Sequence, residues 1–149
     1  MAACIRNYFQ RALRMLFYVK VYLIALIAFL AVDFVWLALV ARNFYRKHLG
    51  FLLAEQPNLW AAAVFYLLFV AGVVVFAIIP ALTEGSLWKA IILGGFFGLV
   101  TYATYDLTNQ ATVKNWPWVV TVIDLAWGGF LAASVSCIGY LAGRWLESP

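Results

Sequence analysis

The sequence predicts an all-α integral membrane protein with four transmembrane helices and an amphipathic N-terminal helix. Of its 149 residues, 67% are hydrophobic and only 11% are charged, whereas a soluble domain is nearer half apolar and a quarter charged. A soluble fold of this length could not bury so much apolar surface. In addition, four runs nearly free of charge are each long enough to cross a bilayer, which takes about 20 residues.

The four runs are 21–41, 56–83, 90–113 and 115–143. The first, third and fourth each contain a single charged residue, an aspartate, and the second contains none. Prolines such as Pro57 and Pro117 fall near the ends of the runs, where proline is tolerated. Tryptophans such as Trp60 and Trp88 also mark the ends, as expected for a ring that favours the membrane interface. We therefore expect a single transmembrane domain at 20–142 with helices at about 20–41, 60–82, 88–110 and 118–142, followed by a short tail at 143–149.

The segment 1–19 differs from these runs because it is basic and contains no acidic residue. Arg6 and Arg14 lie on one side of a helix, whereas Ile5 and Phe9 lie on another. This pattern predicts an amphipathic helix that lies in the membrane interface. Two interpretations remain open for it, an uncleaved organellar targeting segment and a basic flank that fixes the orientation of the first span.

Basic residues lie mainly at the ends of the predicted spans, and this distribution favours contact with lipid headgroups. Six are on the N-terminal side of the predicted topology and four on the other side, which places the N-terminus inside. We expect a bacterial inner membrane, with an organellar inner membrane as the alternative. No basic face of the kind that binds nucleic acid is present, so no nucleic-acid partner is predicted.

Metal and cofactor motifs are missing from the sequence. The cysteines, Cys4 and Cys137, and the single histidine, His48, do not have the spacing of a metal site. His48 is expected in a basic loop at 42–48. The sequence also contains no nucleotide-binding loop and no serine nucleophile motif. We therefore predict neither a metal nor a cofactor.

The main chemical signal is three aspartates inside the predicted spans, Asp33, Asp106 and Asp124. A carboxylate in hydrocarbon costs on the order of 3 kcal/mol, which makes it a candidate functional residue. Because a helix rises about 1.5 Å per residue, all three lie within roughly 6–12 Å of the same membrane face. We therefore expect a carboxylate cluster there, with these residues as the candidate catalytic groups.

Aromatic and polar side chains on the same helices extend this cluster and would line a cleft that binds substrate. Gly94 and Gly98 lie four apart, a spacing that lets two helices approach closely. The structural alternative is that each aspartate bonds to a neighbouring helix and only holds the bundle together. The candidate substrate-binding residues are Trp36, Tyr102, Tyr105, Asn109, Thr121 and Trp127.

Three stretches carry a resemblance to a known family: DFVWLALVARNFYRKHLGFLLA, AAVFYLLFVAGVVVFAIIPAL and LVTYATYDLTNQATVKNWPWVVTVIDLAWG. They resemble a family of small, mostly bacterial membrane proteins known as domain of unknown function 2177. The resemblance covers about residues 20–142, and its most specific parts are TYDLTN and IDLAWG. It implies a four-helix membrane protein and brings no established activity.

Three hypotheses for function remain open, and whether the protein is an enzyme stays undecided. In the first, the carboxylate cluster binds or modifies a lipid-like amphipathic substrate near one membrane face, because buried carboxylates can act as general acid and base. In the second, a homodimer acts as a proton-coupled transporter of small molecules. In the third, the protein is an accessory subunit of a larger membrane complex. The expected partners are accordingly membrane lipid and either further copies of the chain or a larger complex.

Overall fold

The structure, a computed structural model, describes residues 2–147, with side chains described from residue 10 onward. All its regular elements are helical, and four continuous helical rods are long and apolar enough to cross a membrane, which confirms the predicted fold class. The elements are α1 (Ala2–Trp36), η1 (Leu37–Ala41), α2 (Arg42–Leu49), α3 (Leu59–Val73), η2 (Val74–Ile78), α4 (Ile79–Glu84), α5 (Leu87–Thr112) and α6 (Trp118–Glu147).

The first rod is longer than predicted at both ends. It does not stop at residue 41 but continues through η1 into α2, so the basic segment 42–48 is helical and not a loop. Arginine and lysine are good helix formers, and no glycine or proline interrupts the chain before Gly50. The arginine and lysine side chains of α2 are exposed and lie at the end of this rod.

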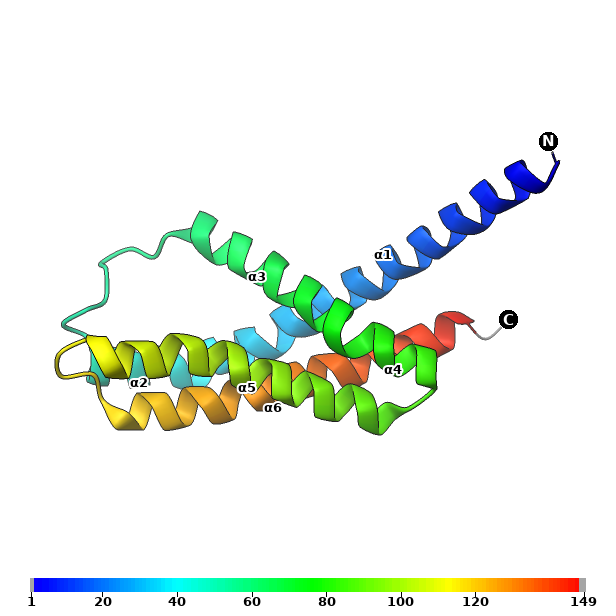
Figure 1. Cartoon of the computed structure of the whole chain (residues 1–149). Helices are drawn as coiled ribbons and strands as arrows, with labels where there is room; N and C mark the ends of the chain where they lie inside the picture. The colour runs from blue at the N-terminus through cyan, green and yellow to red at the C-terminus, as the bar shows by residue number, and fades with distance from the viewer. Residues whose placement is uncertain (1, 148–149) are drawn as a thin grey trace.

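The N-terminal segment predicted at 1–19 is the beginning of α1, which runs without interruption from Ala2 into the membrane-spanning part (Figure 1). Side chains of residues 1–9 lie outside the described residues. The interfacial position of this segment therefore stays a prediction.

Each of the first two rods contains one turn of π-helix, η1 and η2. η2 directly precedes α4, whose second residue is Pro80. Proline has no N–H to donate and its ring crowds the carbonyl of Phe76, four residues earlier. A wider turn accommodates this loss, and such turns are a recognised cause of helix bending.

The helices α5 and α6 form the most extensive pair and run antiparallel, with α1 packed against α6 (Figure 1). Glycines allow the close approach. A Cβ atom on Gly98 would lie 2.0 Å from the carbonyl oxygen of Gly128, and one on Gly94 would lie 2.2 Å from Oγ of Ser136. The small-residue pattern read from the sequence is therefore the contact surface between these two helices.

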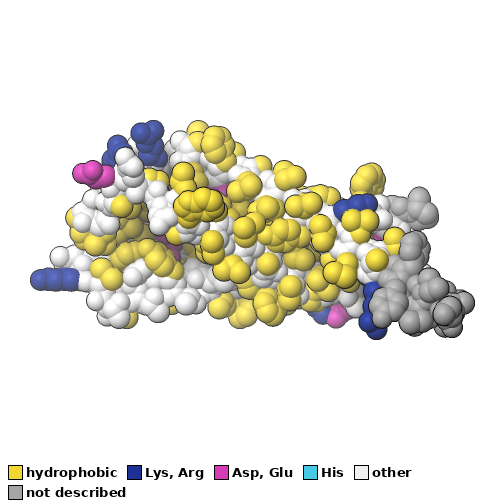
Figure 2. All heavy atoms as spheres, turned by 90° about the horizontal axis from the view of Figure 1, so that it is seen from above, with side chains coloured by type: hydrophobic (Ala, Val, Ile, Leu, Met, Phe, Trp, Pro, Cys, Tyr) yellow, Lys and Arg dark blue, Asp and Glu magenta, His cyan; other side chains and the backbone are white. Residues whose placement is uncertain are grey.

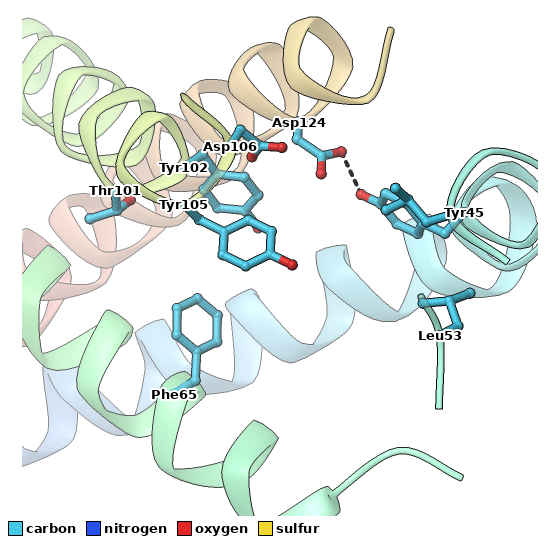
Figure 3. Close-up of a pocket in the computed structure, with 9 residues that line it drawn as sticks. Tyr45, Leu53, Phe65, Thr101, Tyr102, Tyr105, Asp106 and Asp124 are labelled. Atoms are coloured by element: carbon cyan, nitrogen blue, oxygen red, sulfur yellow. Dashed lines mark hydrogen bonds between the residues drawn. The ribbon is translucent and has the colours of Figure 1, made fainter. Parts of the chain in front are cut away.

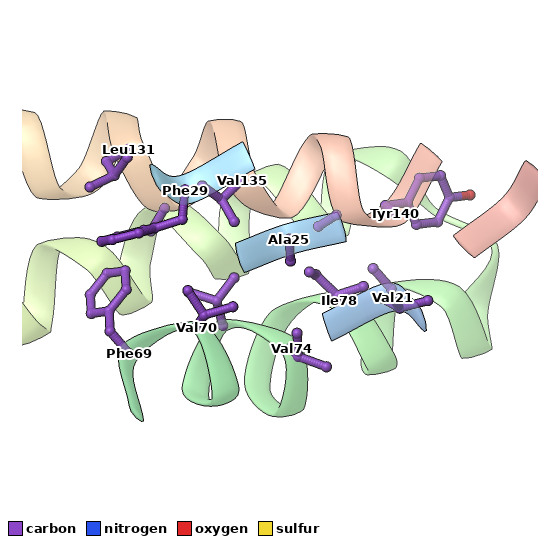
Figure 4. Packing of buried hydrophobic residues seen from close by; sticks show 14 of the residues in the cluster. Val21, Ala25, Phe29, Phe69, Val70, Val74, Ile78, Leu131, Val135 and Tyr140 are labelled. Atoms are coloured by element: carbon purple, nitrogen blue, oxygen red, sulfur yellow. The ribbon is translucent and has the colours of Figure 1, made fainter. Parts of the chain in front are cut away.

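The apolar core lies nearer to the ends of the bundle that carry the termini (Figure 4). Phe29 on α1 packs there with Val70 on α3, Ile78 in η2 and Leu131 on α6, all of them buried. Toward the opposite end, α3 diverges from α5 and α6 (Figure 1). That divergence places the 50–58 and 113–117 connections around a less filled part of the molecule.

Surface side chains agree with a position across a membrane. Hydrophobic side chains cover the middle of the visible face, and lysine and arginine side chains lie toward its two ends (Figure 2). Large apolar side chains that are mostly exposed include Phe34, Leu39, Leu68 and Phe96. Since a soluble monomer rarely exposes so large an apolar surface, this belt is the surface that faces lipid.

The topology predicts the outcome of a labelling experiment. Single cysteines at Gln56 and at Lys114 should react from one side of the membrane, and a cysteine at Glu147 should react from the other, in a background in which both native cysteines are serine. Lys114 is a better site than Asn115, because the φ of Asn115 is +62° and a cysteine there would be strained. Reaction of Gln56 and Lys114 from opposite sides would contradict the four-span arrangement.

Candidate functional site

A cavity of about 470 Å³ lies where α3 diverges from α5 and α6 (Figure 3). A smaller chamber of about 250 Å³ adjoins it and shares the side chains of Tyr45, Phe65 and Tyr102. The larger cavity is lined by Tyr45, Leu49, Leu53, Phe65, Thr101, Tyr102, Tyr105, Asp106 and Asp124. The smaller chamber is lined by Asp33, Trp36, Leu37, Tyr45, Ala62, Phe65, Tyr66, Tyr102 and Trp127.

All three predicted aspartates are buried at this end of the bundle. Asp33 is 7% exposed, Asp106 is 0% exposed and Asp124 is 6% exposed, so none of them faces lipid. Asp106 and Asp124 line the larger cavity, whereas Asp33 lines the smaller chamber. The ring of Tyr102 lines both chambers and therefore lies between the two groups of acids.

Asp124 is held by a tyrosine from a different rod. The hydroxyl of Tyr45 on α2 donates a hydrogen bond of 2.5 Å to Oδ1 of Asp124 on α6 (Figure 3). A hydrogen bond from an O–H to a carboxylate is typically this short. This bond ties α2 across the larger cavity and fixes the direction of the Asp124 carboxylate.

Asp106 has no such partner. Neither of its carboxylate oxygens accepts a hydrogen bond from any of the residues that the structure describes. Its side chain lies beside that of Asp124 at the wall of the larger cavity (Figure 3). Buried polar atoms are nearly always hydrogen-bonded in proteins, so Asp106 stands out as a group whose partner has to come from elsewhere.

In the smaller chamber, Asp33 has a hydrogen-bond donor of the kind that Asp106 lacks. The hydroxyl of Tyr66 on α3 donates a hydrogen bond of 2.9 Å to Oδ2 of Asp33 on α1. Trp127 lies close to the same carboxylate, and its ring stacks on that of Trp36 with centroids 4.4 Å apart and planes 13° apart. Because it bonds one helix to another, Asp33 fits the structural alternative better than Asp106 does.

The candidate substrate-binding residues divide into two groups. Tyr102, Tyr105, Trp36 and Trp127 line one chamber or the other, whereas Asn109 and Thr121 line neither. The hydroxyl of Thr121 instead accepts a hydrogen bond from Nε1 of Trp116 and donates one to Oε1 of Gln110, both at 3.1 Å. These bonds brace the turn between α5 and α6.

Sequence reasoning missed several residues of the site, above all Tyr45, because segment 42–48 was expected to be a loop. Tyr45 and Leu49 are four apart on α2 and therefore share the side that faces the cavity. The spacing of these two residues within an otherwise basic segment could have predicted that they share one side of a helix. No sequence pattern singles out Phe65 and Tyr66 on α3, since the residues around them are apolar as well.

The charged side chains that line the two chambers are all acidic. No lysine, arginine or histidine lines either chamber, and the ion pairs within the described residues, Lys89–Glu84 and Arg144–Glu147, lie at the other end of the bundle. No group of histidine, cysteine, aspartate and glutamate within that part of the chain is arranged to hold a metal ion. The three carboxylates therefore lack a positive partner supplied by the described residues.

Comparison with known proteins places the chain in a family. The family model described as predicted membrane protein, domain of unknown function 2177, matches residues 18–141, which confirms the resemblance of the sequence motifs. No curated protein and no solved structure matches the chain. The matched range includes α5, most of α6 and all three buried aspartates. The chain thus belongs to the family of predicted membrane proteins called domain of unknown function 2177.

Proposed function

We propose that this protein binds an amphipathic, lipid-like molecule in the larger cavity, with the polar end of the molecule against Asp106 and Asp124. The observation that carries the proposal is the composition of this cavity. Its volume of about 470 Å³ is within the range of ligand sites, which are mostly apolar with a few convergent polar groups. Here Leu49, Leu53 and Phe65 supply apolar walls, and the carboxylates lie together on another wall.

The position of the cavity supports entry from the membrane. α3 diverges from the rest of the bundle at this end (Figure 1), and Phe65 and Leu53 at the cavity wall are 46% and 50% exposed. A lipid tail that enters between α3 and α5 stays among apolar side chains along the way. Its polar end then reaches the carboxylates near one membrane face.

The carboxylates offer chemistry as well as binding. An aspartate within hydrogen-bond reach of a substrate can accept a proton from it or donate one to it. Asp124 is oriented for this by Tyr45, and Asp106 has both oxygens free of described donors. If the protein modifies the bound molecule, this pair of carboxylates would accept or donate the proton. If the protein only binds the molecule, the pair would recognise its polar end.

A matched pair of substitutions on α5 tests the proposal. Thr101 lines the cavity whereas Thr104 is exposed and does not, yet both hydroxyls bond to a carbonyl four residues earlier, at 2.9 Å and 2.8 Å. Phenylalanine at Thr101 would fill the cavity, and phenylalanine at Thr104 would point to lipid. We expect Thr101→Phe to reduce lipid retained through detergent purification about tenfold, which corresponds to about 1.4 kcal/mol, and Thr104→Phe to retain it, as measured by native mass spectrometry.

Equal retention by both variants would remove the cavity as the binding site. The lipid composition of membranes from a deletion strain and from the wild type then separates binding from modification. A lipid species that accumulates in the deletion strain and disappears on complementation would identify a modified substrate.

A further inference from the structure

We propose that the polar end recognised at Asp106 and Asp124 is a primary ammonium group, so that the ligand is an aminophospholipid with an ethanolamine-type headgroup. This inference rests on the proposed function and specifies its substrate class. It stands on an unpartnered buried carboxylate, on the charge of the cavity and on the chemistry of its walls.

The unpartnered carboxylate supplies the first argument. Asp106 is fully buried and lines the cavity, and its two oxygens meet no donor among the described residues. An ionised carboxylate only accepts hydrogen bonds, whereas an ammonium group of the lysine type has three N–H donors and no acceptor. A ligand with this group therefore matches the unpartnered oxygens of Asp106 and the second oxygen of Asp124, to which Tyr45 does not donate.

Charge supplies the second argument. Two carboxylates line the same cavity, and no cationic side chain among the described residues lines it. Buried charges in proteins are paired or coordinate a metal, and no metal-binding arrangement is present within the described part of the chain. A cationic headgroup would supply the charge that is missing, whereas an anionic headgroup would add a third negative charge.

The walls supply the third argument. Tyr102 and Tyr105 lie next to Asp106, and Phe65 lines the cavity farther from the carboxylates (Figure 3). Aromatic faces attract ammonium groups by cation–π interaction. Arg42 and Arg46, four apart on the exposed side of α2, lie at the same end of the bundle. Arginine favours phosphate, so these two side chains are phosphate-binding groups available at this end of the bundle, although neither lines the cavity.

The test compares three phospholipids with identical acyl chains, titrated onto purified full-length protein and followed by native mass spectrometry. Phosphatidylethanolamine has N–H donors and a positive charge, phosphatidylcholine has the charge without the donors, and phosphatidylglycerol has neither. We expect phosphatidylethanolamine to bind at least about tenfold more tightly than either of the others, because the loss of a buried charged hydrogen bond typically costs more than this factor.

Substitution should remove the preference while lipid binding remains. We expect Asp106→Asn to bind the three lipids within about twofold of one another, and Glu55→Gln to keep the preference of the wild type. Glu55 is exposed and lines neither chamber, so it is a matched change of charge at the same end of the molecule. If Asp106→Asn does not fold, as judged by gel filtration and thermal unfolding, Asp124→Asn takes its place with the same expectation.

The possible failures can be told apart. Equal binding of the three lipids by the wild-type protein would overturn the ammonium inference and leave the proposed function standing. Failure of all three to bind would overturn both. Displacement of phosphatidylethanolamine by equimolar glycerophosphoethanolamine, which has the headgroup without acyl chains, would show that a soluble amine is sufficient and would overturn the assignment to lipid.

Discussion

Replacement of Asp106 by asparagine is expected to abolish biological function and to leave stability unchanged or higher. Asparagine has nearly the same shape, so the packing of α5 against α6 is retained. It removes a negative charge that is fully buried and has no donor among the described residues. An uncompensated carboxylate in the membrane costs on the order of 3 kcal/mol, and part of this free energy should be recovered as stability.

The expected loss of function follows from the same chemistry. An amide does not titrate, so it cannot act as general acid or base, and it carries no charge with which to pair a cation. Complementation of a deletion strain should fall to the level of an empty vector, while the midpoint of thermal unfolding in detergent rises or stays the same. A variant that is both more stable and inactive has the signature of a functional residue that costs stability.

If the aspartates only hold the bundle together, Asp106→Asn should instead keep its biological function. A bridging role requires a partner, and Asp33 and Asp124 have partners in Tyr66 and Tyr45, whereas Asp106 has none within the described residues. Asp106→Asn with full complementation would therefore remove both the enzyme and the proton-coupled transporter from consideration. Glu84→Gln, which changes an exposed acid at the other end of the bundle, is the matched control and should complement fully.

The sequence was sufficient to predict the four spans. Long apolar runs leave few alternatives in a bilayer, because every backbone N–H and C=O must be bonded within a helix. Since the helix rise is fixed, the positions of Asp33, Asp106 and Asp124 along their spans also determine which membrane face they approach. In the structure the three aspartates line two adjoining chambers, and their depth in the membrane stays a prediction.

The cavity could not be predicted in the same way. Its shape depends on the angle at which α3 leaves the bundle (Figure 1), and such angles are set by packing between helices and not by the period of a single helix. The role of Tyr45 could not be predicted from the sequence for a related reason. Its contact with Asp124, 79 residues away, exists only because α2 continues the first rod past residue 41.

Thr121 shows the limit of assigning a site from a helical face. It precedes Asp124 by three residues and so shares its side of α6. Yet its hydroxyl bonds to Trp116 in the adjoining turn and to Gln110 near the end of α5. Position on a face predicts which elements a side chain can meet, and the local turn decides which of them it bonds.

Replacement of Gly98 by alanine is expected to destabilise the protein by about 3 kcal/mol, the upper range for overpacking in a well-filled interior. The new Cβ would lie 2.0 Å from the carbonyl oxygen of Gly128 and 2.7 Å from Cβ of Ala132. The first of these atoms belongs to backbone, so no rotation of a side chain can relieve the contact. α5 and α6 would have to move apart along their whole line of contact.

Gly95 on the same helix provides the control, because alanine at this position is not expected to lower the stability. A Cβ there would lie 3.6 Å from Cβ of Ala133 and 3.7 Å from the carbonyl oxygen of Gly129, both ordinary contacts. Because alanine favours a helix over glycine by about 1 kcal/mol, Gly95→Ala should be neutral or stabilising. Thermal unfolding in detergent measures both changes, and equal midpoints for the two variants would contradict the close packing of α5 on α6.

The same substitution connects the packing of the bundle to its site. Gly98 and Asp106 lie on α5, Gly128 and Asp124 lie on α6, and all four side-chain positions are on the buried sides of this pair. If Gly98→Ala pushes the helices apart, the two carboxylates separate too and can no longer meet one headgroup together. Gly98→Ala should therefore lose lipid selectivity at temperatures well below its unfolding midpoint, whereas Gly95→Ala should keep it. Retained selectivity in folded Gly98→Ala would show that the two acids act independently.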